Sequence, residues 1–297
     1  MSAASGTVPR LIRLSDGRQL ACAELGDPAG RPVIVFHGLP GSRLQQHPDP
    51  GIARGLGLRL IHFDRPGFGL SAPRPRRSLP QAAADVAELA DRLGIREFAV
   101  AGVSGGTPPG LACTALLGTR VLRTAIISGL GPPGSIGGAA VNPGARVGYF
   151  LAHRASWVMK FPLQAAAAMA RRNPQRYLDS IATALSPPDR RILGRPEVRA
   201  VMAADVVEAF RQGAAAMIED LSLATREWGL PLGTIRTPVS FWHGMEDWVV
   251  PDGAARHLAA AIPGAALHLL PGEGHFVIFE IWPQIAAWLA GPAAGAA

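Results

Sequence analysis

The sequence predicts an α/β protein with a mainly parallel sheet of about eight strands, helices on both faces of the sheet, and an inserted helical cap. Short runs such as Pro32–Phe36 and Phe98–Val103 are apolar at every position, which is typical of strands covered on both faces. Segments with a helical pattern alternate with these runs, which favours parallel pairing of the strands. One long stretch, 133–233, has helical segments and no strand-like run.

The first strands are expected before residue 64. Leu11–Leu14 and Arg18–Ala23 form a predicted hairpin, because the Asp-Gly pair between them supplies the positive φ of a tight turn. Pro32–Phe36 and Leu58–Phe63 are the next strands, and each opens into a loop rich in Gly and Pro. Loops of this kind at the carboxyl ends of buried strands commonly carry the site of an α/β protein.

A helix is predicted after these loops. Ser78 is its expected N-cap, Gln81 completes a capping box three residues later, and Gly94 marks its end. The strands Phe98–Val103 and Thr124–Ser128 follow. The chain should therefore return to the sheet twice before the insertion begins.

The insertion divides the predicted core. Residues 1–132 and 234–297 are assigned to the core domain and residues 133–233 to a helical cap, with helices expected near Leu163–Arg172 and Val198–Gln212. After the cap, strands are expected at 238–244 and 267–270, a helix at 253–261, and a final helix through residues 285–288.

The composition is that of a globular protein that can bury a large core. Of the 297 residues, 48% are hydrophobic and 17% are charged, which excludes a disordered chain. The net charge of +7 could suggest nucleic-acid binding. However, the arginines are scattered from Arg10 to Arg256, whereas a nucleic-acid interface gathers them on one face. We therefore expect no nucleic-acid partner, and the sequence predicts no oligomeric state.

Cysteine usage and the N-terminus lead us to expect a cytoplasmic location. Cys22 and Cys113 lie far apart in the sequence and are expected to be buried free thiols. No basic segment followed by an apolar one opens the chain, and no run of about 18 apolar residues is present. Neither a signal peptide nor a membrane span is expected, although an extracytoplasmic location is the alternative.

Ser104 is the predicted nucleophile. It lies between a predicted strand and a predicted helix, and Gly102, Ser104 and Gly106 match the pattern G-x-S-x-G. Small residues on both sides of the serine let the chain turn sharply enough to expose the hydroxyl. A tight glycine-rich turn with an incidental serine is the alternative interpretation of this motif taken alone.

A serine nucleophile needs a base and a group that orients the base. Of the eight histidines, His275 is the candidate base, because it lies in a Gly-flanked loop after the last predicted strand. Asp247 is the candidate acid, since it follows the preceding strand and the loop after Ser128 offers no carboxylate. Glu246 is the competing acid, but the spacing to the following Val-Pro pair favours Asp247.

Together these motifs resemble the α/β-hydrolase fold superfamily, of the kind with a helical cap between the sixth and seventh strands. The order Ser104, Asp247, His275 is the order of nucleophile, acid and base in that superfamily. The resemblance covers about residues 11–289 and is weakest over the cap. The matching residues are His37-Gly38 with Pro40-Gly41, Asp64 to Gly69, Gly102 to Gly106, His243-Gly244 with Asp247 and Pro251, and Gly272 with Gly274-His275.

The resemblance also implies an oxyanion hole formed by the backbone N–H groups of Leu39 and Gly105. Two preorganised donors facing the developing negative oxygen would lower the barrier by several kcal/mol, roughly 3 for each donor. His37 is interpreted as a loop histidine and Asp64 as a carboxylate that organises its loop. The residues expected to line the substrate pocket are His37, Trp157, Phe161, Trp248 and Phe276.

The expected activity is that of a serine hydrolase that cleaves an ester, thioester or lactone of a small, largely apolar substrate through an acyl-enzyme on Ser104. Amide hydrolysis and carbon–carbon bond hydrolysis on the same triad are alternatives. A hydrolase-like protein that only binds a ligand is the alternative from another class. No cofactor and no metal ion are expected.

Overall fold

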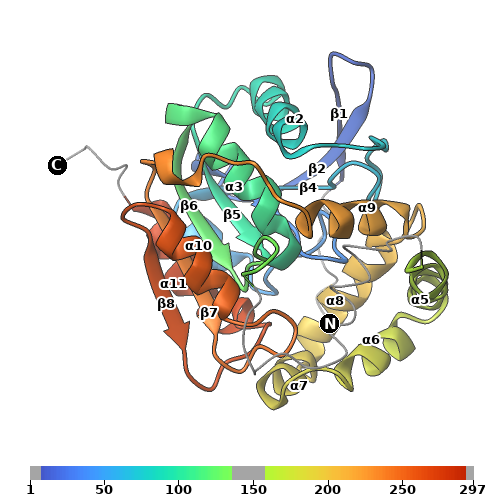
Figure 1. The fold of residues 1–297 in the computed structure, drawn as a ribbon. Helices are drawn as coiled ribbons and strands as arrows, with labels where there is room; N and C mark the ends of the chain where they lie inside the picture. Colours follow the sequence, from blue (N-terminus) through green and yellow to red (C-terminus); the bar gives the residue numbers. More distant parts are fainter. Residues whose placement is uncertain (1–7, 136–157, 292–297) are drawn as a thin grey trace.

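A computed structural model describes residues 8–135 and 158–291 of the chain (Figure 1). Its described strands form one eight-stranded sheet in the order β1-β2-β4-β3-β5-β6-β7-β8. Only β1 with β2 and β2 with β4 pair antiparallel, and the other neighbours pair parallel. The predicted fold class is confirmed. The strands are β1 (Arg10–Arg13), β2 (Gln19–Gly26), β3 (Arg31–Phe36), β4 (Leu58–Phe63), β5 (Phe98–Val103), β6 (Val121–Ile127), β7 (Val239–Gly244) and β8 (Ala266–Leu270).

Helices cover both faces of this sheet. Helices α2 (Leu79–Arg92), α3 (Thr107–Leu116) and α10 (Gly253–Ala261) pack on one face, and α1 (Gly51–Gly55) and α11 (Ile278–Ala290) pack on the other. Because neighbouring side chains of a strand point to opposite faces, each strand contributes to two cores. In β3, for example, Ile34 and Phe36 join the first core, whereas Val33 and Val35 join the second.

The predicted signals at the ends of α2 are confirmed. The Ser78 hydroxyl accepts a hydrogen bond from the Gln81 N–H at 3.3 Å, and the Ser78 N–H donates to Gln81 Oε1 at 3.0 Å. This capping box satisfies two backbone donors at the start of the helix. Gly94, just beyond the end, has a φ of 70°, which a glycine adopts without strain.

Between β6 and β7 the described part of the chain contains helices and no strand. Two of these helices were predicted: α5 begins three residues before the expected Leu163, and α8 runs from Pro196 to Ala209 rather than from Val198 to Gln212. Proline is accepted in the first turn because its missing N–H would be unbonded there. The helices are α5 (Lys160–Arg172), α6 (Pro174–Ala182), α7 (Pro187–Leu193), α8 (Pro196–Ala209) and α9 (Ala215–Ala224).

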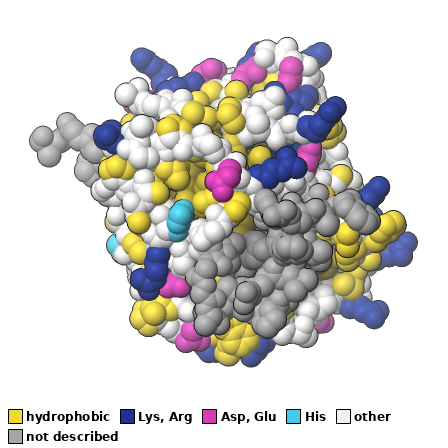
Figure 2. Space-filling model, in the orientation of Figure 1, with side chains coloured by type: hydrophobic (Ala, Val, Ile, Leu, Met, Phe, Trp, Pro, Cys, Tyr) yellow, Lys and Arg dark blue, Asp and Glu magenta, His cyan; other side chains and the backbone are white. Residues whose placement is uncertain are grey.

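These five helices lie together beside the sheet (Figure 1) and have a hydrophobic cluster of their own, which includes Tyr177, Met202, Val206 and Phe210. This separate cluster is what a cap would have, and we keep the cap as an interpretation of the described residues 158–233. On the face of the molecule shown in Figure 2, the Lys and Arg side chains are scattered rather than gathered in one patch.

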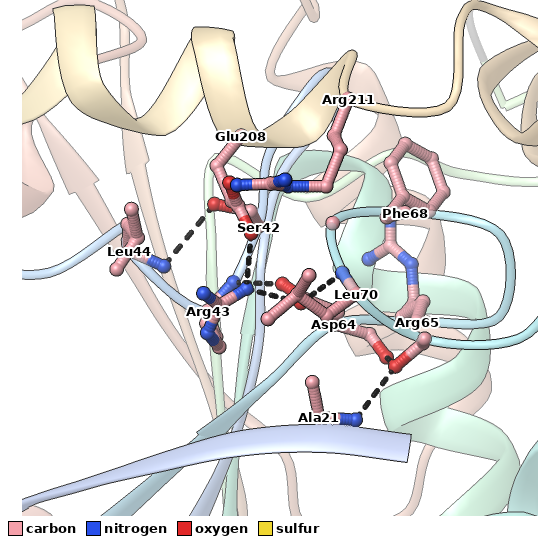
Figure 3. A network of polar contacts seen from close by, with 12 residues as sticks. Ala21, Ser42, Arg43, Leu44, Asp64, Arg65, Phe68, Leu70, Glu208 and Arg211 are labelled. Atoms are coloured by element: carbon pink, nitrogen blue, oxygen red, sulfur yellow. Dashed lines mark hydrogen bonds and ion pairs between the residues drawn. The ribbon is translucent and has the colours of Figure 1, made fainter. Parts of the chain in front are cut away.

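Buried ion pairs hold the cap on the core (Figure 3). The Arg43 guanidinium lies 2.5 Å from Asp64 Oδ2 and 2.6 Å from Glu208 Oε1, so one arginine joins the loops after β3 and β4 to helix α8. The Asp64 carboxylate also accepts hydrogen bonds from the Arg43 and Leu70 N–H groups, at 2.7 and 2.9 Å. Asp64 therefore organises its loop, as predicted. Asp220 of α9 likewise forms ion pairs with two arginines of the core, Arg65 and Arg77.

Candidate active site

Ser104 lies at the sharp turn between β5 and α3. Its φ of 50° is in the left-handed region, which is strained for a residue with a side chain. Glycines on both sides make room for this turn. A Cβ on Gly106 would overlap the Phe36 carbonyl group, and a Cβ on Gly102 would lie 3.1 Å from the Gly106 carbonyl oxygen.

Ser104, His275 and Asp247 form a continuous row of hydrogen-bonded side chains. His275 Nε2 lies 3.1 Å from Ser104 Oγ, and His275 Nδ1 lies 2.7 Å from Asp247 Oδ2. All three side chains are buried. The structure thus brings together the three residues expected from the sequence, which follow strands β5, β8 and β7.

The charges in this row favour a basic imidazole. Asp247 Oδ1 accepts hydrogen bonds from the N–H groups of Val249 and Val250, each at 2.8 Å. Burial by itself would raise the pKa of Asp247, but the rings of His275 and His243 outweigh burial and bring this pKa to about 2. Burial likewise would lower the pKa of His275, yet the Asp247 carboxylate raises it above the usual 6.5. His275 is therefore positioned to accept a proton from Ser104, and the Asp247 carboxylate makes its ring more basic.

His243, at the end of β7, also lies beside the Asp247 carboxylate. Its Nε2 donates a hydrogen bond to the Val250 carbonyl oxygen at 2.8 Å and lies 3.3 Å from Asp247 Oδ2. The ring is fully buried. It fixes the turn that aims Asp247 at His275, a role that the sequence analysis did not assign.

The loop that carries His275 is held at two neighbouring backbone groups. The Ser128 hydroxyl, at the end of β6, donates to the His275 carbonyl oxygen at 2.8 Å. Asp189 of cap helix α7 accepts a hydrogen bond from the Phe276 N–H at 2.7 Å and one from the Ser186 hydroxyl at 2.8 Å. The position of Ser128 at the end of a predicted strand could have indicated its role, whereas no sequence signal distinguishes Asp189.

Leu39 and Gly105, the expected oxyanion donors, lie against each other beside Ser104. A Cβ on Gly105 would overlap the Leu39 side chain, and a Cβ on Gly38 would lie 3.5 Å from the Ser104 Cβ. Gly105 also lies in the 3-10 turn that leads into α3, where backbone N–H groups lack intrahelical acceptors. This placement supports the proposed oxyanion hole.

A chain of hydrogen bonds links helix α8 to the loop that carries Gly38 and Leu39. Asp205 of α8 accepts hydrogen bonds from the Ser42 N–H at 2.7 Å and from Gln45 Nε2 at 3.0 Å. Gln45 Oε1 in turn accepts from the Gly38 N–H at 2.6 Å. Burial raises the pKa of Asp205 to about 7, although the hydrogen bonds from Ser42 and Gln45 act against this. The loop beside the nucleophile is thus fixed by a cap residue.

His37 is a buried loop histidine and not a pocket residue. Its Nδ1 donates to the Gly38 carbonyl oxygen at 2.9 Å, and its Nε2 accepts from the Arg65 N–H at 3.2 Å. Burial and the nearby Arg65 charge hold the pKa of His37 well below its usual value. His37 is not among the residues that line the cavity beside Ser104, so the expectation that it lines the pocket is not met.

A mostly apolar cavity of about 440 Å³ opens beside Ser104 and His275. Phe276 lines it, as expected, but Phe161 and Trp248 do not: these side chains are 79% and 43% exposed at the surface. Trp157 lies outside the described residues. Helical and loop positions do not reveal side-chain direction, which explains these errors. Lining residues that the sequence did not indicate include Leu60, His62, Met202, Val206 and Trp282.

The described residues 8–135 and 158–291 contain neither a cluster of metal ligands nor a helix that could span a membrane. No group of three or more His, Cys, Asp or Glu side chains there is arranged to hold a metal ion. No helix in these residues combines the length and the apolar character needed to cross a bilayer.

This chain is similar to known proteins both over about a third of its length and over most of it. A probable proline iminopeptidase from Streptomyces coelicolor is 32% identical over 112 residues, which cover 34% of this chain and 33% of that protein. The match therefore spans about a third of that relative. The dihydrolipoyllysine-residue acetyltransferase component of an acetoin cleaving system from Pseudomonas putida is 28% identical over 293 residues, or 95% of this chain and 68% of that protein.

The fold comparison agrees with the sheet described above. A thermophilic esterase from Thermogutta terrifontis superposes with a TM-score of 0.67 at 21% identity, covering 95% of this chain and 96% of that one. A family model described as alpha/beta hydrolase fold matches residues 31–280, which is most of the chain. Since this match includes Ser104, Asp247 and His275 together with the strands that carry them, the chain belongs to the alpha/beta hydrolase fold family.

Proposed function

We propose that this protein is a serine hydrolase that cleaves an ester, thioester or lactone of a small, largely apolar substrate. The observation that carries the proposal is the hydrogen-bonded row of Ser104, His275 and Asp247 at the wall of an apolar cavity. A serine whose hydroxyl faces a basic imidazole, itself oriented by a carboxylate, is an activated nucleophile.

In the proposed reaction, Ser104 Oγ attacks the substrate carbonyl carbon while His275 Nε2 takes the hydroxyl proton. The negative oxygen that develops would lie near the N–H groups of Leu39 and Gly105. His275 then gives its proton to the leaving oxygen or sulfur, the carbon–heteroatom bond breaks, and an acyl-enzyme remains on Ser104. Water, activated by the same histidine, releases the acid.

The cavity supports a neutral substrate. None of its described lining residues is Asp, Glu, Lys or Arg. Bringing a charged group into such a site without an opposite charge would be costly. The esterase name of the Thermogutta terrifontis neighbour agrees with an ester substrate but shows only the fold.

Amide hydrolysis is the second candidate, favoured by the partial likeness to a probable proline iminopeptidase. A panel of p-nitrophenyl esters and lactones, compared with L-proline p-nitroanilide and other anilides, separates the two. We expect ester turnover that Ser104→Ala abolishes. Faster cleavage of the anilides than of every ester would replace our proposal with the second one.

A fluorophosphonate probe tests whether the protein is an enzyme at all. We expect labelling of Ser104 in the folded wild-type protein and none after heat denaturation or in Ser104→Ala. Absence of labelling in the folded protein would favour a non-catalytic ligand-binding protein with the same cavity.

A further inference from the structure

The peptide group between Gly38 and Leu39 carries one of the two proposed oxyanion donors, and its carbonyl oxygen is held by two side chains. This oxygen accepts hydrogen bonds from His37 Nδ1 at 2.9 Å and from Arg65 Nη2 at 3.2 Å. A trans peptide group is planar, and its C=O and N–H bonds point in opposite directions. The Leu39 N–H therefore points away from Arg65 and His37, in a direction that these contacts help to set.

Gln45 holds the preceding N–H group of the same loop. Its Oε1 accepts a hydrogen bond from the Gly38 N–H at 2.6 Å, and its Nε2 donates one to Asp205 Oδ2 at 3.0 Å. Asp205 is fully buried in helix α8, whereas Gln45 is half-buried and lines the cavity that contains Ser104. A residue of the cap thus reaches the loop beside the nucleophile through a single side chain.

Asp205 decides which end of the Gln45 amide faces Gly38. Asp205 Oδ1 accepts hydrogen bonds from the Ser42 N–H at 2.7 Å and from the Ser42 hydroxyl at 2.6 Å. An ionised carboxylate only accepts, so the NH₂ end of Gln45 must face Asp205 and its oxygen must face Gly38. With the amide reversed, two donors would face each other at Gly38.

The Asp205 carboxylate is buried without a cation. Among the described residues its partners are Ser42 and Gln45, and no Lys or Arg forms an ion pair with it. Glu208, one turn further along α8, is instead paired with Arg43. Burying a carboxylate without a cation is costly, and such groups gather at functional sites.

We propose that Asp205 is a positioning residue for catalysis, because through Gln45 it orients the Gly38–Leu39 backbone so that the Leu39 N–H meets the negative oxygen of the transition state. This inference rests on the proposed hydrolysis at Ser104. An oxyanion donor is effective when it is already aimed at the place where charge develops. The cap then contributes to the rate of the reaction besides covering the cavity.

Asp205→Asn should lower kcat and leave KM nearly unchanged. The Ser42 N–H keeps the oxygen of the new amide on its side, so the new NH₂ group faces Gln45. The Gln45 amide must then reverse, which removes the acceptor of the Gly38 N–H. For p-nitrophenyl hexanoate we expect kcat to fall at least about tenfold and KM to stay within about threefold of wild type. The assay is run at about pH 8, above the pKa of Asp205, which is about 7.

Adding Gln45→Glu to Asp205→Asn should restore the rate. The double variant exchanges the carboxylate and the amide between the two positions and keeps the total charge. The carboxylate at position 45 can accept from both the amide at position 205 and the Gly38 N–H, so that Gly38 again has an acceptor. We expect kcat of the double variant to return to within about threefold of wild type.

Glu208→Gln is the matched control. Glu208 also lies in α8 and joins the cap to the core, but it does so through the Arg43 side chain and not through Gln45. This variant should lower the free energy of unfolding in urea and keep kcat near wild type. A merely structural role of Asp205 would give both variants the same loss of activity, and Gln45→Glu would not reverse it.

A wild-type kcat in Asp205→Asn, or a loss that Glu208→Gln matches and Gln45→Glu does not reverse, would overturn the inference while the proposed function stands. If wild type hydrolyses no ester, the proposed function has failed instead. The exchange rate of the Gly38 amide hydrogen, measured by NMR, then decides the question. We expect faster exchange in Asp205→Asn than in wild type and in the double variant; equal exchange in all three would overturn the role of Asp205.

Discussion

Replacing Asp247 by asparagine is the sharpest test of the proposed triad. Asp247 Oδ1 accepts hydrogen bonds from the N–H groups of Val249 and Val250, and Oδ2 accepts one from His275 Nδ1. In Asp247→Asn the two backbone donors would keep the amide oxygen on their side. The amide NH₂ group would then face His275, so that Nδ1 must accept a hydrogen bond and the ring proton moves to Nε2.

That tautomer cannot take a proton from Ser104, because Nε2 already carries one. The ring also loses the carboxylate, 2.7 Å from Nδ1, that would stabilise its protonated form. We expect turnover to fall about 10⁴-fold with little change in substrate binding. At about 1.4 kcal/mol for each factor of ten, this loss corresponds to roughly 5 kcal/mol of transition-state stabilisation.

The assay is steady-state hydrolysis of a p-nitrophenyl ester, followed by active-site titration to count competent enzyme. Glu246→Gln is the matched control, because Glu246 is adjacent in sequence but exposed. It should remain close to wild type. Our assignment of the acid is refuted if Asp247→Asn keeps activity within tenfold of wild type, or if Glu246→Gln is the inactive variant.

Three further predictions concern the base, the oxyanion hole and the cap. The rate of Ser104 acylation should rise with pH through a midpoint above 6.5, because His275 must be neutral to act as base and Asp247 raises its pKa. A rate of fluorophosphonate labelling that is flat between about pH 5 and 9 would contradict this. Gly105→Val should lower kcat at least about 100-fold and leave the circular dichroism spectrum unchanged, since the new side chain would overlap Leu39 and move a proposed oxyanion donor. Near-normal turnover would exclude Leu39 and Gly105 as the oxyanion donors. Asp189→Asn should lower the free energy of unfolding, measured in urea, by about 1–3 kcal/mol, because one of the two acceptor oxygens of Asp189 becomes a donor. Glu197→Gln, at an exposed position, is the control and should leave the stability unchanged; equal stability of both variants would show that Asp189 does not hold the Phe276 backbone.

The inner strands of the sheet could be predicted because they are apolar on both sides and are separated by clear turn signals. Short elements without such patterns were missed: α1 has only five residues, two of them glycine. In the cap, tertiary packing rather than local pattern decides where helices end. The predicted helix through Gln212 stops at Ala209, before the turn that precedes α9.

The triad could be located for a topological reason. Parallel strands bring their carboxyl ends to one edge, so residues that follow different strands meet there. The residues that line the pocket could not be predicted in this way, because pocket lining depends on the direction in which each side chain points. Phe161 lies on the exposed side of α5, and His62 was set aside because it lies inside a strand, although it faces the cavity.

Arg43 couples the stability of the cap helices to that of the core. Its guanidinium is shared between Asp64 in the core and Glu208 in the cap, and all three side chains are buried. Lifting the cap would leave Asp64 and Arg43 with an incomplete set of partners in a poorly hydrated site, which is far costlier than breaking a surface ion pair. Local opening of α8 should thus be suppressed, and its amide hydrogens should exchange only in the cooperative transition that also disrupts the sheet.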